Sequence, residues 1–327
     1  MEYKTNPIIT RYPEIILSYK DVPYSSALTF NAAAIKRKGQ YIMLFRNDYG
    51  SFDEQRLDGT NIGLAYSNDG IKWKVEPKPV FSLNTGKYRR VYDPRLTVID
   101  DEIYLCFAVD SLYGVSGGIA KVNDDFTKFD IISISVPDNR NMVLFPEKIN
   151  DRYVRLERPM PVYGVPQRPN GTFDIWMSYS KDLVYWGDSK VVLSCEDVKF
   201  CNNKIGPAAP PIKTEKGWLT LFHSVDLDAT RGKNGWEDIW QKRYCVGIML
   251  LDLENPSKVI GISKEPLMVP ETKYETEGCF RNNVVFPCAM IKEDNGIVRI
   301  YYGAGDTYIM MATARISDLI NACCDRV

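Results

Sequence analysis

Asp93, Pro94 and Arg95 place a carboxylate and a guanidinium two residues apart, directly before a segment that alternates apolar and polar side chains. A carboxyl group beside a fixed positive charge is a candidate for proton transfer, because its neighbours tune its pKa. The competing interpretation is an ordinary turn, since Asp and Pro are common turn residues and Arg95 can pair with Asp93. The choice between a catalytic carboxylate and a turn depends on which other residues the fold places beside Asp93.

Basic side chains recur at the ends of strand-like segments. They are Arg46, Arg140, Arg158, Lys204 and His223, the only histidine of the chain. Forked guanidinium groups and an ammonium group together suit a phosphate or carboxylate ligand. Taken singly, each can instead pair with a nearby acid, as Arg158 can with Glu157, or lie solvated at a strand end. Their shared place in a repeated unit favours a common site.

Other catalytic patterns are missing. His223 is not accompanied by G-x-S-x-G, and the chain has no G-x-x-x-x-G-K phosphate loop. One histidine cannot supply a His-rich metal site, and neither H-E-x-x-H nor EF-hand spacing occurs. We therefore expect no metal and no organic cofactor, and Asp93 remains the best candidate for acid–base work.

Short strands must position these residues. One unit, an apolar strand, a polar turn and an aromatic-rich strand, begins at Phe30, Tyr92, Asn141, Gly206 and Asn283. A second unit, a strand, a turn and an aromatic residue, follows at Ile62, Gly118, Ile175, Val246 and Ile309. Five copies at a period of ~40–50 residues predict an all-β fold, a five-bladed β-propeller, rather than a β-sandwich. We expect one domain over residues 1–327, with helix only in ISDLINACC near its end.

In a propeller the first strand of each blade lines the central channel, so the starts of the five first units should converge. These starts are Asn31, Asp93, Arg140-Asn141, Lys204 and Arg281-Asn282. The ends of the paired strands add Arg46-Asn47-Asp48, Asp110, Arg158, His223 and Asp306. Polar groups at one end of a ring of apolar strands form a typical ligand site. This placement favours a pocket around Asp93 over a simple turn.

The composition excludes several classes of protein. Hydrophobic residues make up 45% and charged residues 25% of the 327, as in globular proteins. A net charge of −1 gives no basic field for nucleic acid or an anionic membrane, and no apolar run approaches the ~20 residues of a membrane span. The N-terminal segment does not read as a signal peptide, and the eight cysteines form no C-x-x-C pair. We expect a reduced, cytoplasmic protein.

Several motifs, spread over essentially the whole chain, resemble one family. They are FNAAAI, YDPRL, NRNMVLFPEKI, YVRLERP, KIGPAAPPIKTEKGWLTLFHSVD, NNVVFPCA and IYYGAGDTY. The sequence is similar to the glycoside phosphorylases of family 130, five-bladed propellers that cleave β-mannosides with inorganic phosphate. The resemblance implies phosphate as co-substrate, a β-mannoside oligosaccharide as substrate, α-D-mannose 1-phosphate as product and a homo-oligomeric assembly.

The resemblance also implies roles for individual residues. Asp93 is expected to be the catalytic acid, reaching the glycosidic oxygen through a hydroxyl of the mannose itself. Phosphate ligands are expected at Arg140, Asn141, Arg158, Lys204 and His223, with Tyr302 as a further candidate. The mannosyl ring is expected to contact Asn31, Arg46, Tyr92 and Asp306. Arg56, in the loop segment GSFDEQRLDGTN, is a candidate contact for the acceptor sugar that the resemblance does not fix.

This chemistry agrees with the residues present. An inverting hydrolase needs a second carboxylate to activate water, whereas phosphate is already a charged nucleophile that needs positioning. The retained basic residues favour a phosphorylase over a β-mannoside hydrolase, and they have no purpose in a non-catalytic sugar-binding propeller.

The sequence defines the acceptor sugar less closely than the mannosyl group. The extended loop Asp228–Lys242 favours β-1,4-mannooligosaccharides or mannosyl-N-acetylglucosamine over 4-O-β-D-mannosyl-D-glucose, and a β-1,2-specific branch is a further alternative. Trp236 and Trp240 in this loop can stack on sugar rings, pack at a subunit contact or belong to a solvated loop.

Overall fold

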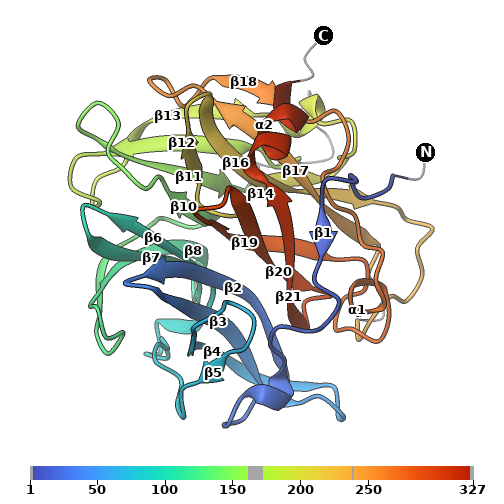
Figure 1. The fold of residues 1–327 in the computed structure, drawn as a ribbon. Helices are drawn as coiled ribbons and strands as arrows, with labels where there is room; N and C mark the ends of the chain where they lie inside the picture. Colours follow the sequence, from blue (N-terminus) through green and yellow to red (C-terminus); the bar gives the residue numbers. More distant parts are fainter. Residues whose placement is uncertain (1–2, 161–171, 238, 325–327) are drawn as a thin grey trace.

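Five antiparallel sheets form a ring in the computed structural model, which describes residues 3–160, 172–237 and 239–324 (Figure 1). Blade 1 consists of β2 (Leu28–Arg37), β3 (Gln40–Ser51), β4 (Arg56–Ser67) and β5 (Lys74–Val75). Blade 2 consists of β6 (Tyr88–Ile99), β7 (Glu102–Ser111), β8 (Gly114–Val122) and β9 (Phe129–Ile134). Blade 3 consists of β10 (Asn139–Leu144), β11 (Tyr153–Pro159), β12 (Ile175–Ser180) and β13 (Gly187–Leu193).

The last two blades depart slightly from this pattern. Blade 4 consists of β14 (Lys204–Pro207), β15 (Ile212–Thr214), β16 (Gly217–Leu227), β17 (Lys242–Leu251) and β18 (Val259–Ile262), with β14 and β15 both paired to β16. Blade 5 consists of β19 (Val285–Lys292), β20 (Ile297–Ala304), β21 (Tyr308–Arg315) and β1 (Thr10–Arg11). Short helices connect or follow the blades: η1 (Tyr19–Asp21), η2 (Cys195–Asp197), α1 (Lys273–Thr276) and α2 (Ile316–Cys324). The predicted all-β, five-bladed propeller is confirmed.

The fifth blade is completed from the other end of the chain. The weak fifth copy of the second unit does not supply a fourth strand, because the chain turns into helix α2 after β21, as ISDLINACC predicts. The fourth position is taken by β1, which pairs Thr10 with Thr313 and Arg11 with Ala312 (Figure 1). Segments from the two ends of the chain therefore close the ring.

Each pair of neighbouring blades buries its own apolar cluster, because the two faces of every sheet pack against the next sheet. Leu44 of blade 1 and Leu105 of blade 2 share one cluster, and Ala32 of blade 1 and Tyr301 of blade 5 share another. The smallest of the five inter-blade clusters lies between blades 2 and 3, around Cys106. None of the helices in the described residues is both long and apolar enough to cross a membrane.

The closing strand is held by a buried ion pair. Arg11 donates from Nε to Glu275 Oε1 at 2.9 Å, and the Tyr302 hydroxyl donates to the same oxygen at 2.9 Å. Glu275 is completely buried. Removing one partner of such a pair leaves the other charge buried and uncompensated, which is strongly destabilising.

We therefore predict that Arg11→Ala lowers the free energy of unfolding by about 3–5 kcal/mol. Chemical denaturation followed by circular dichroism measures this change. The matched control is Lys38→Ala, which removes an exposed partner of Asp124 and should leave the midpoint close to that of the parent protein. Equal, small effects of the two substitutions would contradict the structural role of Arg11.

Candidate active site

A repeated backbone distortion sets the site at the centre of the ring. Asn31, Asp93 and Asn141 occupy the same position in the inner strands of blades 1, 2 and 3, and all three have positive φ, at 49°, 53° and 58°. At each of them the pairing with the next strand shifts by one residue, which is a β-bulge. Asn and Asp adopt left-handed φ more readily than other non-glycine residues. The bulges bring three polar side chains to one end of the channel.

Asp93 lies among the residues expected to hold the sugar. Its Oδ1 accepts from Asn31 Nδ2 at 2.8 Å and from Arg46 at 3.3 Å. Arg46 is fixed in turn by two hydrogen bonds to Asp48, of 2.8 and 2.7 Å. Its guanidinium lies between the rings of Phe30 and Tyr92, 4.4 and 4.9 Å from their centroids. The positions of Asn31, Arg46 and Asp93 are therefore consistent with a shared role.

The charge state of Asp93 follows from these contacts. Burial alone raises the pKa of its carboxyl, but Arg46, Arg95 and the hydrogen bond from Asn31 outweigh burial and leave the pKa below its ordinary value. Arg95 does not act through a direct hydrogen bond. It donates to the main-chain carbonyls of Pro94 and Ala208, thereby linking the bulge of blade 2 to blade 4. In the free site Asp93 is ionised at neutral pH.

The expected phosphate ligands also converge. Arg140 donates to the Tyr92 hydroxyl at 3.4 Å, and Arg158 donates to Nε2 of His223 at 2.9 Å. Lys204 faces aromatic rings, with Nζ 5.8 Å from the centroid of Phe173. The Nε atoms of Arg140 and Arg158 are buried and have no hydrogen-bond partner among the described residues.

The cost of gathering these charges is visible in their pKa values. Burial, followed by the charge of Arg140, lowers the pKa of Arg158 to about 9. The pKa of Lys204 falls well below its ordinary value because of burial and then the charges of Arg158, Lys242 and Arg140. Despite burial, Arg140 keeps a raised pKa because of Tyr92, Tyr244 and Asp93, whereas the pKa values of Arg158 and Lys204 are lowered in part by its charge. A bound anion would relieve this repulsion and stabilise the cluster.

His223 is neutral in the free site, contrary to its sequence-based assignment to the cations. Its Nδ1 lies 3.2 Å from the Pro207 carbonyl, which can only accept, so Nδ1 carries the proton and Nε2 accepts from Arg158. Burial and the nearby positive charges lower its pKa well below the ordinary value. Gly206 faces this ring, and a Cβ on Gly206 would lie 2.4 Å from the ring carbon Cε1. The glycine of the K-I-G motif makes room for His223.

The tyrosine of the cation cluster is Tyr244, which the sequence analysis did not identify. Its ring is 5.4 Å from Lys204 Nζ and stacks on His223 at 6.0 Å. Tyr302, the predicted candidate, is instead a structural residue of blade 5, because its hydroxyl is bonded to Glu275. The motif R-Y-C-V-G, in which Tyr244 precedes a buried cysteine, was the signal that could have found it.

Asp306 is linked to the extended loop through one arginine. Arg281 donates to Asp306 at 3.2 Å and to Glu237 of the loop at 2.6 Å. Burial raises the pKa of Asp306, and Arg281 and Arg46 only partly oppose this effect. Asp306 and Asp93 therefore depart from their ordinary pKa in opposite directions.

The two tryptophans of the loop pack within the chain. Trp240 is buried beside Phe286 and donates from Nε1 to the Asn282 carbonyl at 3.0 Å. Trp236 contacts the rings of Phe52 and Phe280. These contacts contradict a solvated loop. Both indole rings help to fix the loop against the residues that they contact.

Arg56 interacts with acidic residues of its own hairpin. It begins β4 at the tip of the β3–β4 hairpin, is exposed, and pairs with its neighbours Glu54 and Asp58. These contacts are those of a solvated hairpin, so the structure offers no support for Arg56 as an acceptor contact. Within the described residues, no group of three or more His, Cys, Asp and Glu side chains could hold a metal ion.

Comparison with known proteins agrees with this geometry. The family model of glycoside hydrolase family 130, described as β-1,4-mannooligosaccharide phosphorylase, matches residues 3–325. A 1,2-β-oligomannan phosphorylase from Thermoanaerobacter sp. (strain X514) is 32% identical over 312 residues, covering 93% of this chain and 96% of the relative. A β-1,4-mannooligosaccharide phosphorylase from Ruminococcus albus is 31% identical over 332 residues, covering 98% and 89%.

A solved structure has the same architecture. The β-1,2-mannobiose phosphorylase from Listeria innocua, in complex with β-1,2-mannobiose, superimposes with a TM-score of 0.82 at 25% identity, covering 96% of this chain and 99% of that one. The match of the family model over nearly the whole length agrees with the motifs that surround Asp93. The chain therefore belongs to glycoside hydrolase family 130.

Proposed function

We propose that this chain catalyses the inverting phosphorolysis of β-mannosides and releases α-D-mannose 1-phosphate. The observation that carries the proposal is the cluster of Arg140, Arg158 and Lys204, whose contacts among the described residues are to neutral groups. Buried cations that face one another are stable only when an anion joins them. Phosphate matches the fork of a guanidinium and is a competent nucleophile.

Asp93 is the proposed general acid, and it must gain a proton before it can act. Its pKa is lowered in the free site, in part by the charge of Arg140. A phosphate dianion bound to Arg140 offsets that charge, and a sugar ring in the pocket excludes water. Both changes raise the pKa of Asp93. We infer that Asp93 becomes an effective acid only when both substrates are bound.

The linkage is proposed to be β-1,4, in mannooligosaccharides or mannosyl-N-acetylglucosamine. The description of the family model and the Ruminococcus albus relative support this choice. The second candidate is a β-1,2-mannoside, which the names of the Thermoanaerobacter and Listeria relatives favour. The β-1,4 and β-1,2 substrates differ in how the acceptor sugar is attached. We propose that the loop 228–242 contributes to the acceptor side of the pocket.

Product analysis with β-1,4-mannobiose and β-1,2-mannobiose, each with and without inorganic phosphate, tests this function. We expect mannose 1-phosphate from the β-1,4 disaccharide only when phosphate is present. Release of free mannose without phosphate would identify a hydrolase and overturn the role of the cation cluster. Mannose 1-phosphate from the β-1,2 disaccharide alone would overturn only the linkage.

We predict that Asp93→Asn lowers kcat by about 10²–10⁴-fold, the usual contribution of a general acid. The amide keeps the shape of the side chain and its contact with Asn31 but cannot donate a proton as an acid does. Steady-state rates with saturating phosphate measure the loss, and circular dichroism checks the fold. The control is Asp101→Asn, on a fully exposed hairpin, which should retain parental activity. Parental turnover in the Asp93 variant would refute the assignment.

We also predict that binding of the phosphate dianion takes up a proton at pH values between the free-site and the bound-state pKa of Lys204. Lys204 has a lowered pKa in the free site, and a bound anion raises that pKa toward its ordinary value. A group whose pKa rises on binding gains a proton, so phosphate affinity falls as pH rises through the free-site pKa of Lys204. Titration calorimetry in buffers of different ionisation enthalpy measures the uptake. Uptake that is unchanged in Lys204→Met would show that another group is responsible.

A further inference from the structure

A groove of about 730 Å³ opens on the outside of the ring between blades 2 and 3. It lies where the apolar cluster between neighbouring blades is smallest. One wall is the connection between β9 and β10, residues 133–139, and the other is the turn between β12 and β13 with part of β11. None of its lining residues is among those assigned to the catalytic pocket.

The floor of the groove is polar and has no net charge. Arg155 pairs with Glu157 at 2.8 Å, and Asn139 donates to the same carboxylate at 2.7 Å. The Arg155 guanidinium also lies 4.1 Å from the ring centroid of Trp186. The Oδ1 atom of Asn139 is buried and has no hydrogen-bond partner among the described residues. Such a floor suits a neutral ligand that offers hydroxyl donors rather than an anion.

The rim is unusually apolar for exposed positions. Tyr185 is 80% exposed and Val136, on the opposite wall, is 79% exposed. Trp186, beside Tyr185, is held by a hydrogen bond from Nε1 to the Leu183 carbonyl at 2.9 Å. An exposed aromatic face above planar polar groups is the usual composition of a sugar-binding surface, because the C–H faces of sugar rings stack on aromatic rings.

The repeat shows that the turn itself does not require Tyr185. Blades 1 and 2 contain the same turn, in which an Asp side chain accepts from main-chain N–H groups two or three residues ahead. Blade 3 repeats this pattern with Asp182, which accepts from the N–H groups of Val184 and Tyr185. The position of Tyr185 is occupied by Lys72 in blade 1 and Lys128 in blade 2.

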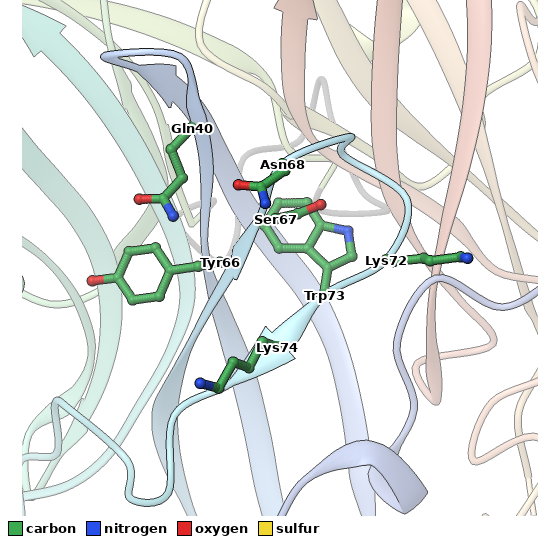
Figure 2. A pocket seen from close by; sticks show the side chains of 7 residues that line it. All are labelled: Gln40, Tyr66, Ser67, Asn68, Lys72, Trp73 and Lys74. Carbon is green, nitrogen blue, oxygen red and sulfur yellow. The ribbon is translucent and has the colours of Figure 1, made fainter.

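The turn of blade 1 lines its own smaller hollow, of about 310 Å³ (Figure 2). Figure 2 shows Lys72 and Trp73, the counterparts of Tyr185 and Trp186, among the residues that line this hollow. The tryptophan therefore belongs to the architecture of the repeated turn. Among these three blades only blade 3 carries the tyrosine. Its turn lines the groove of about 730 Å³, which is larger than the hollow at the turn of blade 1.

The groove begins next to the catalytic pocket. Asn139 pairs with Pro159 across the β10–β11 ladder, and the next pair along is Arg140 with Arg158. The lining of the groove and two proposed phosphate ligands are therefore adjacent residue pairs of the same ladder. A chain longer than a disaccharide can use a surface at this distance, whereas a disaccharide in the pocket cannot.

We propose that this groove is a second binding site for a neutral oligosaccharide, a β-mannoside chain, outside the catalytic pocket. The identity of the sugar rests on the proposed function; the neutral floor and aromatic rim do not. Tyr185 stacks on a sugar ring above the polar floor. The site holds a long substrate near the pocket and adds affinity without taking part in the chemistry.

The test is titration of the whole protein with β-1,4-mannohexaose in the absence of phosphate, followed by the same titration of Tyr185→Lys. Lysine is the residue that blades 1 and 2 carry at this position, so the turn is expected to fold normally. The parent protein should show two binding events, and the variant should bind at the second one about three- to tenfold more weakly, the range for loss of one aromatic stack. The control is Tyr113→Lys, which changes a 74% exposed tyrosine outside the groove.

Kinetics and sedimentation complete the test. In Tyr185→Lys, kcat/KM for mannohexaose should fall by the same factor, and kcat/KM for mannobiose should not change. Identical hexaose titrations of parent and variant would overturn the proposal, whether or not the protein forms mannose 1-phosphate. A parental dimer that Tyr185→Lys dissociates in analytical ultracentrifugation would also overturn it, because the groove would then hold a second copy of the chain.

Discussion

Three left-handed bulges, at Asn31, Asp93 and Asn141, are the constraint on which the rest of the site depends. A regular strand would direct successive side chains alternately to its two faces, into the apolar contacts with neighbouring blades. The bulge interrupts this alternation at one residue, so a polar group can reach the channel while the strand beyond it stays in the core. The repetition of the bulge in consecutive blades places two amides and one carboxylate around a common centre, and the second strands of blades 1 and 3 then supply Arg46 and Arg158.

Burial combined with uneven neighbouring charge governs the electrostatics of the site. Around Asp93 opposite charges are present, so the carboxylate is stabilised and its pKa falls. Around Lys204 like charges dominate, so the pKa of the ammonium falls as well. Asp93 is consequently held away from the protonated state that a general acid requires, and the charged form of Lys204 is disfavoured. The substrates supply the missing charges, which couples the binding of phosphate to the protonation of the acid.

The sequence predicted the ring and its five blades, and it proposed the residues of the site, because these features repeat. Asp93, Arg140, Arg158, Lys204 and His223 could be found from their equal positions in successive copies. Tyr244 was missed, although it lies in the motif R-Y-C-V-G, because it follows the long connection between β16 and β17, which interrupts the repeat. Tyr302 was misplaced for a related reason: its position in the repeat matches that of Arg158, but its hydroxyl is bonded to Glu275, a contact between distant segments that periodicity does not reveal. The neutral state of His223 likewise depends on burial, which a sequence pattern does not report.

The pairing of β1 with β21 has a consequence for the order in which the protein forms. Thr10 and Thr313 are partners, so the contact that closes the ring joins residues from opposite ends of the chain. Forming it fixes a loop of nearly the whole protein, and contacts of such large sequence separation are formed slowly. During synthesis the first four blades can stack as they emerge. β1, the outer strand of blade 5, is made first but has no partner until β21 has left the ribosome. The channel, and with it the convergence of the acid and the cations, is therefore among the last features to be completed.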